Sequence, residues 1–187
     1  MEQKTIRAVW NDKTIRVYQA YNNIISSEAI RIGTFGTSFK RDRMTWIKPS
    51  FLWMMYRSGW ASKENQEHIL AIDIKRSGFD FLLESAIPST YNNSIGINKE
   101  NWQYKLKNSD VICQWDPERD VWGNPLEQRS IQLGLRGNAL NCYINEWIID
   151  IKDITDYVIK LKHMRDDNID ISDLLPSESA YYSNPYS

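Results

Sequence analysis

The sequence predicts an α+β fold, with a mixed or antiparallel sheet and flanking helices. Strand-like and helix-like segments are mixed along the chain without the regular strand–helix–strand rhythm of a parallel α/β protein. Hydrophobic residues make up 42% and charged residues 25% of the 187 positions, as in ordinary globular proteins. A chain of this length buries about 70% of its unfolded surface. We therefore expect a single globular domain at 1–172, followed by a flexible tail at 173–187.

The N-terminal region predicts a hairpin and a short helix. Two extended segments, 5–7 and 14–16, flank a turn-forming Asn-Asp pair at 11–12. One of the serines at 26–27 caps a helix that runs toward Gly33. The chain then continues as a loop into a segment that is both basic and aromatic.

The middle of the chain predicts two helices around a buried strand. Pro49 suits the first turn of a helix and Gly59 suits its end. Apolar residues at 69–74 indicate a buried strand, and a capping pattern precedes a helix at 78–86. The region 88–108 is polar and rich in asparagine, which indicates a long surface loop or lid.

The C-terminal half predicts further strands and two helices. Ile131, Leu133 and Leu135 face one way while Ser130 and Gln132 face the other, which is typical of a strand. Apolar stripes at helical spacing mark the helices. The expected elements are a strand at 111–115, a turn at 116–120, a strand at 129–135, a helix at 140–147, a strand at 148–151 and a helix at 154–164.

The overall charge and the termini exclude several classes of protein. The net charge of −1 argues against a general nucleic-acid binder, although a local basic cleft stays possible. Cys113 and Cys142 have no metal-like spacing and make no disulfide framework. The N-terminus has no apolar signal core, and no apolar run reaches the roughly 20 residues of a membrane span. We expect a cytoplasmic protein with free thiols and no membrane partner.

Familiar catalytic motifs are missing from the sequence. Neither His68 nor His163 sits in a metal-binding spacing, so we expect no metal. The chain has no Gly-x-Ser-x-Gly, no Walker loop and no dinucleotide glycine fingerprint. A hydrolase triad, a P-loop enzyme and a Rossmann dehydrogenase are therefore disfavoured.

Residues 39–60, the basic-aromatic segment, carry the clearest functional signal. The segment holds five cations and six aromatic rings in 22 residues. Cations suit phosphate and rings suit a stacked base, so the pattern indicates an anionic, flat-ringed ligand. The alternative is a buried helix preceded by a solvated basic loop; for the loop half, the alternation of rings and cations favours function. The candidate ligand-binding residues here are Lys40, Arg41, Arg43, Trp46, Lys48 and Arg57.

Three other motifs offer candidate site residues. Arg16 could hold a phosphate while Tyr18 or Tyr21 stacks on a ring, or the arginine could pair with a carboxylate while the tyrosines pack. Glu118 follows a predicted strand and could act as a general base, or could pair with Arg119 in a surface turn. On the strand at 129–135, Gln132 could orient a ligand hydroxyl beside Arg129, although any half-exposed strand looks the same.

Four motifs together resemble the domain-of-unknown-function family 4291. They are residues 15–21, the basic-aromatic segment, residues 114–119 and residues 129–132. The resemblance covers about residues 5 to 160. A more distant similarity, to the ADP-ribosyltransferase plan, lies in an early strand with an arginine and tyrosines, a helix, and a late strand ending in Gln or Glu.

The transferase similarity implies a fold and roles for particular residues. Arg16 would hold the ribose or phosphate of NAD, Tyr18 or Tyr21 would stack on nicotinamide, and Gln132 would steady the ribose. Gln132 stands where such enzymes often have Glu, and the basic-aromatic segment is not a standard part of the plan. These differences make transfer to a protein acceptor doubtful.

The predicted function is therefore an NAD-utilising, ADP-ribosyltransferase-like enzyme with a basic-aromatic cleft. NAD would be its substrate, the bound ligand would be nucleotide-like, and nucleic acid is a possible acceptor. Its predicted catalytic residues are Arg16, Gln132 and Glu118. The reaction would pass through an oxocarbenium-like state stabilised by electrostatics, and an enzyme of this kind should hold Glu118 or Gln132 beside Arg16 in one pocket. The alternative is a non-catalytic module that binds nucleotide or single-stranded nucleic acid in an open groove. A structural interaction protein would leave the clustered cations and rings unexplained.

Overall fold

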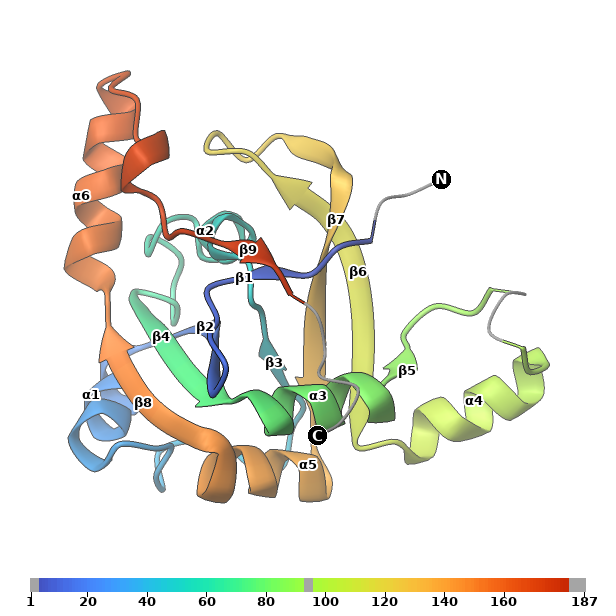
Figure 1. Cartoon of the computed structure of the whole chain (residues 1–187). Coiled ribbons are helices and arrows are strands. Elements are labelled where there is room, and N and C mark those ends of the chain that lie inside the picture. The colour runs from blue at the N-terminus through green and yellow to red at the C-terminus, as the bar shows by residue number, and fades with distance from the viewer. Residues whose placement is uncertain (1–3, 93–95, 182–187) are drawn as a thin grey trace.

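A computed structural model of the chain describes residues 4–92 and 96–181. It confirms the α+β class, with helices around mixed and antiparallel sheets (Figure 1). The strands are β1 (Arg7–Ala8), β2 (Thr14–Tyr21), β3 (Thr45–Ile47), β4 (His68–Lys75), β5 (Ile87–Pro88), β6 (Val111–Arg119), β7 (Pro125–Leu135), β8 (Ile148–Asp153) and β9 (Ser179–Ala180). The α-helices are α1 (Asn23–Ile32), α2 (Phe51–Ser58), α3 (Arg76–Ser85), α4 (Lys99–Asn108), α5 (Gly137–Cys142) and α6 (Thr155–Asp166).

Two sheets form the body of the molecule. One has the antiparallel order β2-β4-β8, and the other has the order β3-β7-β6-β5, in which β5 pairs with β6 in parallel. Helix α3 packs against β2, β4 and β6, so it contacts both sheets (Figure 1). Ile15, Ile72, Phe79 and Leu133 are fully buried between these elements.

The two sheets meet where β2 passes the end of β3. The backbone N–H of Tyr18 donates to the carbonyl oxygen of Lys48 at 2.7 Å, one residue beyond β3. This link brings the C-terminal end of β2 beside the start of α2. It therefore places parts of two motifs that are far apart in the sequence around one space.

Helix α2 lies inside the helix predicted between Pro49 and Gly59. The hydroxyl of Ser50 accepts from the backbone N–H of Trp53 and caps the first turn. At the other end, Gly59 has a φ of 60°, the left-handed conformation that glycine adopts without steric cost. Phe51 is buried, whereas Arg57 is exposed, so the helix has one face in the core and one toward solvent.

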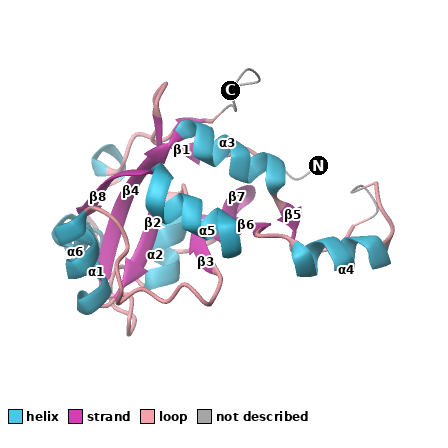
Figure 2. Cartoon of the chain, turned by 90° about the horizontal axis from the view of Figure 1, so that it is seen from below, coloured by secondary structure: helices cyan, strands magenta, loops and turns pink. Residues whose placement is uncertain are grey.

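The segment predicted as a long loop, 88–108, contains a helix instead. Asn98 caps α4 by accepting from the backbone N–H of Asn101, and Trp102 is the buried residue of this helix. The helix projects from the body beside β5 (Figure 2). The polar composition concealed it because a single buried tryptophan gives no apolar stripe.

Strand β6 also differs from the prediction, because it continues through the segment predicted as a turn. Residues 116–119 stay in the strand, and the turn follows at 120–124. Asp120 forms that turn by accepting from the backbone N–H groups of Trp122 and Asn124. Asp116 and Glu118 are therefore strand residues, and Asp120 belongs to the turn.

The predicted C-terminal tail is wrong for residues 173–181. Strand β9 pairs with β1, and the backbone N–H of Tyr181 donates to the carbonyl of Ile6 at 2.7 Å. Tyr181 is 6% exposed, and its hydroxyl donates to Asp80 at 2.5 Å. A two-residue strand is too short to be recognised by alternation. The rest of the predicted tail, 182–187, lies outside the described residues.

The remaining elements follow the predictions with shifted ends. Asn22, not a serine at 26–27, caps α1, and Gly33 ends it. The Asn-Asp turn is present, with the backbone N–H of Asn11 donating to the carbonyl of Thr14. The predicted hairpin is not complete, because β1 pairs with β9 and one bridge, from Trp10 to Ile15, joins its two arms. The helix predicted at 140–147 begins at Gly137 and ends in one π-helical turn. Cys113 and Cys142 are free thiols.

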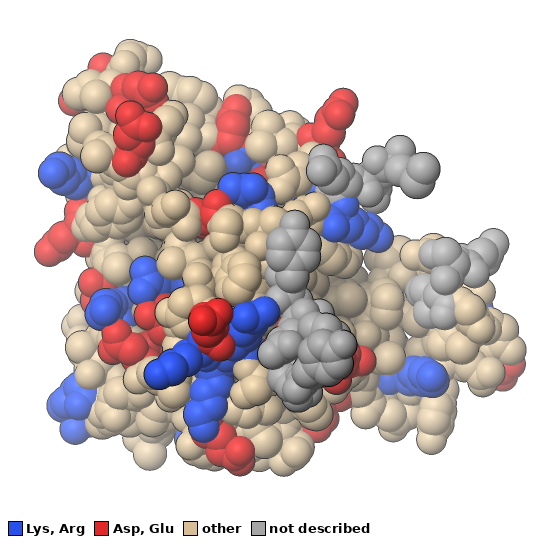
Figure 3. All heavy atoms as spheres, in the orientation of Figure 1, with Lys and Arg blue, Asp and Glu red and all other residues tan. Residues whose placement is uncertain are grey.

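The outer surface drawn in Figure 3 carries acidic and basic side chains intermixed, in keeping with the net charge of −1. On this face no single sign of charge dominates, so it offers no large field to steer an anion. Among the residues the structure describes, no helix is both long and apolar enough to cross a bilayer.

Candidate functional site

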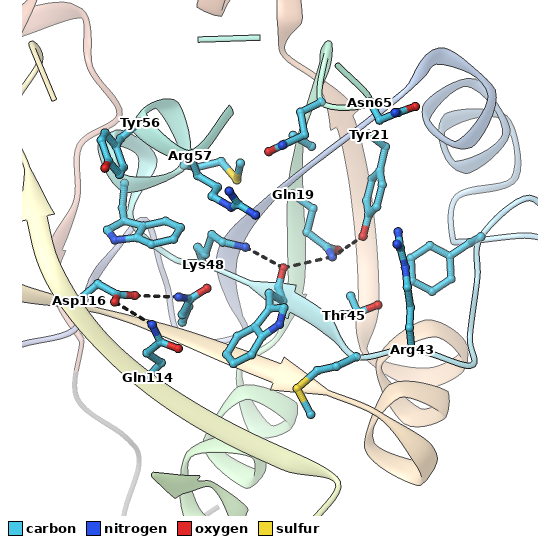
Figure 4. A pocket seen from close by; sticks show the side chains of 18 of the residues that line it. Gln19, Tyr21, Arg43, Thr45, Lys48, Tyr56, Arg57, Asn65, Gln114 and Asp116 are labelled. Atoms are coloured by element: carbon cyan, nitrogen blue, oxygen red, sulfur yellow. Dashed lines mark hydrogen bonds between the residues drawn. The ribbon is translucent and has the colours of Figure 1, made fainter. Parts of the chain in front are cut away.

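A cavity of about 730 Å³ opens where β2, β3, α2, β6 and β7 come together (Figure 4). We call it the central cavity. Its volume lies within the range of small-molecule sites, about 300–1,000 Å³. The residues lining it are Gln19, Ala20, Tyr21, Phe39, Arg43, Met44, Thr45, Trp46, Lys48, Trp53, Met54, Tyr56, Arg57, Glu64, Asn65, Gln66, Gln114, Asp116 and Gln132.

The basic-aromatic segment lines the cavity because of its secondary structure. Trp46 and Lys48 are two positions apart in extended backbone, so they share a face. Trp53, Tyr56 and Arg57 lie three and four positions apart on α2, so they also share a face. Both faces border the central cavity.

Lys48 is the most unusual charge in the cavity. Its side chain is buried, with 6% of the residue exposed, and its Nζ donates to the carbonyl oxygen of Trp46 at 3.1 Å. The Nζ also lies 5.6 Å from the ring centroid of Trp53. The pKa of Lys48 is lowered from 10.5 to about 7, mainly by burial and also by the nearby Arg57 charge, while Asp116 opposes the shift.

Two arginines complete the positive lining. Arg43 precedes β3 and Arg57 lies in the last turn of α2, and both side chains are exposed toward solvent. The positive charge of Arg57 lowers the pKa of Lys48. Arg43, Lys48 and Arg57 therefore line the same cavity, whereas Arg16 does not.

Asp116 organises the wall formed by β6 and β7. One carboxylate oxygen accepts from the side-chain amide of Gln114 at 2.8 Å, and the other accepts from that of Gln132 at 2.7 Å (Figure 4). Gln114 and Gln132 are directly opposite each other in the antiparallel pair. The carboxylate therefore fixes two amides whose carbonyl oxygens remain as acceptors.

A second polar network fixes the wall formed by β2. The amide nitrogen of buried Gln19 donates to the hydroxyl oxygen of Tyr21 at 2.7 Å, and its carbonyl accepts from Tyr143 at 2.7 Å. Burial raises the pKa of Tyr21 above its usual range, so this phenol is neutral. Because its oxygen accepts from Gln19, Tyr21 keeps its hydroxyl hydrogen for another partner.

Arg16 lies outside the central cavity. Its guanidinium forms two hydrogen bonds of 2.8 Å to the carboxylate of Asp73, its cross-strand neighbour on β4. This is the carboxylate pairing that the sequence left as an alternative. The predicted convergence of Arg16 with Gln132 in one pocket is therefore not found.

Tyr18 also lies outside the cavity, in contrast to Tyr21. It is 1% exposed and packs edge-on against Phe51. Its hydroxyl has no hydrogen-bond partner among the described residues. Side chains alternate between the two faces of β2, so Gln19 and Tyr21 point into the cavity while Tyr18 points to the opposite face.

Glu118 lies outside the central cavity and contacts the residue that caps α2. It is 9% exposed, and its carboxylate accepts from the hydroxyl of Ser50 at 2.9 Å and from the backbone N–H of Arg119. Ser50 in turn caps α2, so Glu118 orients that cap. A register shift between Pro117 and Arg119 accompanies this placement away from the cavity.

The other predicted cations are also dispersed. Lys40 is exposed and lies outside the central cavity. Arg41 lines a separate hollow beside α1 and donates to the carbonyl of Phe35 at 3.3 Å. Arg129 lines a smaller cavity of about 260 Å³ with Lys4 and Trp115.

Several cavity residues were not among the predicted site residues, notably Gln19, Asn65, Gln114 and Asp116. Gln114 and Asp116 share a strand face by simple alternation, which is a signal present in the sequence. That signal needed the register of β6 with β7 to connect it to Gln132. Within the described ranges, no group of three or more His, Cys, Asp and Glu side chains lies close enough to hold a metal.

Comparison with protein families gives one decisive match. The family described as "Domain of unknown function (DUF4291)" matches residues 5–181. The chain belongs to this family. The DUF4291 match continues past residue 160, where the motif resemblance ended, and takes in β9. No curated protein matches the chain.

Proposed function

We propose that the protein binds a nucleotide-like, phosphate-bearing ligand in the central cavity. The observation that carries this proposal is the meeting of Arg43, Lys48 and Arg57 with aromatic rings around one space. Guanidinium groups match phosphate geometry with paired N–H donors. A phosphate beside them would offset the repulsion between Arg57 and Lys48, which adds to burial in lowering the pKa of Lys48.

The rings are the reason for preferring a nucleotide to phosphate alone. Trp46, Tyr56 and Phe39 line the same cavity, and the Tyr56 ring already stacks with the guanidinium of Arg119 at 3.9 Å from its centroid. Stacking of a base on an aromatic ring contributes about 1–3 kcal/mol. The carbonyl oxygens of Gln114 and Gln132, whose amides Asp116 fixes, add acceptors suited to a sugar or base edge.

Cleavage of NAD is the second candidate, and Asp116 is the observation that favours it. Loss of nicotinamide creates positive charge at the ribose, which a fixed carboxylate stabilises. Asp116 lines the cavity with its position set by two amides. In this proposal Gln132 keeps the ribose-steadying role implied by the transferase similarity, while Arg43 and Arg57 replace Arg16 at the phosphates.

Calorimetric titration with ADP, ATP and NAD tests the binding proposal. We expect at least one of these ligands to bind, and Arg57→Met to weaken its binding roughly 10- to 100-fold, because a charge-assisted hydrogen bond contributes about 1.5–3 kcal/mol. The matched control is Lys40→Met, which removes an exposed cation of the same segment from outside the cavity.

The control and the thermal melts decide how a loss of affinity is interpreted. Both substitutions are at exposed positions, so each should change stability by under about 0.5 kcal/mol. Equal loss of affinity in both variants would point to general charge attraction rather than to this cavity. Absence of binding by all three ligands would end the nucleotide proposal.

A further inference from the structure

The ammonium group of Lys48 lacks the partner that buried lysines usually have. Among the described residues, none forms an ion pair with it, and its hydrogen bond goes to the neutral carbonyl of Trp46. Buried charged groups are ordinarily paired, because an unpaired charge in a low-dielectric interior is costly. Lys48 therefore places an amine at the cavity wall in surroundings that favour the uncharged form of that amine.

The groups that face Lys48 come from two elements, α2 and β6. Arg57 on α2 opposes its positive charge, Asp116 on β6 supports it, and the Trp53 ring lies on the α2 side. Burial is the largest influence, and the result is a pKa of about 7. A large fraction of the amine then has a free lone pair near neutral pH, which is the state in which lysine acts as a nucleophile.

We propose that Lys48 is the catalytic nucleophile of a nucleotidyl transfer and takes the α-phosphoryl group of a nucleoside triphosphate. This inference rests on the proposed nucleotide site and names its substrate class. Figure 4 shows the Lys48 and Arg57 side chains directed to the same part of the cavity. An amine and a guanidinium there would face the same phosphate.

The reaction is balanced without an oxidant or a further reactant. The Nζ lone pair attacks the α-phosphorus, and a nitrogen–phosphorus bond forms. The bond from the α-phosphorus to the bridging oxygen breaks, and pyrophosphate leaves with its electron pair. The amine proton passes to water. The product is a lysyl-nucleotide phosphoramidate, from which an acceptor could later take the nucleotide.

The charge around Lys48 favours attack on phosphorus over attack on carbon. Addition of the amine to an aldehyde yields a positively charged iminium, and attack on a ribose passes through a positive centre. Arg57 beside the amine would oppose both of these charges. In phosphoryl transfer the charge that needs stabilisation is negative, and arginine clamps supply that stabilisation.

The test is covalent labelling of the full chain by ATP, supplied with magnesium and carrying a radioactive α-phosphate. We expect label that survives denaturing electrophoresis, is stable to base and is released by acid, as a phosphoramidate is. ATP labelled at the γ-phosphate should give none. The labelling rate should rise about tenfold from about pH 6 to about pH 8, because the neutral fraction of Lys48 rises by about that factor.

Three variants separate the possible outcomes. Lys48→Met and Lys48→Arg should lose the label, with thermal melts confirming that they fold, while Lys40→Met should be labelled like the wild type. Label that persists in both Lys48 variants would show that Lys48 is not the nucleophile. Absence of label from the wild type while calorimetry shows ATP bound would show the same. In both cases the proposed nucleotide-binding site would be unaffected. Absence of both binding and label would instead remove the proposed function itself.

Discussion

Asp116 shows how much of the candidate site depends on a single side chain. Its two oxygens hold Gln114 and Gln132, and no other described carboxylate bonds both amides. If NAD is cleaved here, Asp116→Asn should lower nicotinamide release at least about 100-fold, since the neutral amide no longer stabilises developing positive charge. NAD affinity should change less than about fivefold if the carboxylate acts mainly in the transition state.

Asp42→Asn is the matched control for that measurement, because Asp42 is exposed and lies outside the central cavity. Release of nicotinamide would be followed by chromatography. Asp116→Asn activity equal to wild type, with NAD bound equally well, would remove the carboxylate from the reaction. Loss of release together with loss of NAD binding would assign Asp116 to ligand placement only.

At the residue scale, composition within a segment predicted which residues line the central cavity better than single motifs did. Arg43, Trp46, Lys48 and Arg57 were all among the predicted ligand-binding residues, and all line one cavity. Arg16 differs because its partner Asp73 lies 57 positions away on β4. Only the register of β2 with β4 reveals that pairing, and register is a property of tertiary structure.

At the scale of elements, strong local signals predicted structure well, whereas short or polar elements were not predicted. The proline and glycine around α2 bracketed the helix to within two residues of its start. Helix α4 was not predicted because its composition is polar, and β9 was not predicted because it has two residues. The sequence therefore did not predict that the C-terminal segment packs on the core, because the contacts that hold it there form only in the folded chain.

The C-terminal segment carries the prediction at this scale. A chain ending at residue 172 would lose β9, the buried Tyr181 and the Glu178 carboxylate, which accepts from the backbone N–H of Phe51 at 2.7 Å. Removal of a large buried ring costs about 3–5 kcal/mol, so we expect a loss of roughly 6–20 °C in melting temperature. A chain ending at Tyr181 is the control and should melt close to the wild type.

Melting of the shorter chain within a degree or two of the full one would show that the segment contributes little to the fold. The Tyr181 environment makes that outcome unexpected. Its ring contacts Trp10 and Phe79 edge-on, and its hydroxyl bonds Asp80. Loss of the segment would expose both rings to water.

At the scale of the whole molecule, the central cavity exists because two sheets meet. The hydrogen bond from Tyr18 to Lys48 joins β2 to the end of β3, and the walls come from strands of both sheets and from α2. The sequence predicted the class of fold from its mixture of elements. It could not predict this meeting, because the order β3-β7-β6-β5 connects strands that are distant along the chain.

The most direct measurement of the central claim is a crystal structure of the protein grown with ADP. We predict ligand density inside the central cavity, with a phosphate within hydrogen-bond distance of Arg57 or Arg43 and the base against one of the lining rings. Density for ADP on another face of the molecule, with the central cavity holding solvent alone at saturating ligand, would contradict the account.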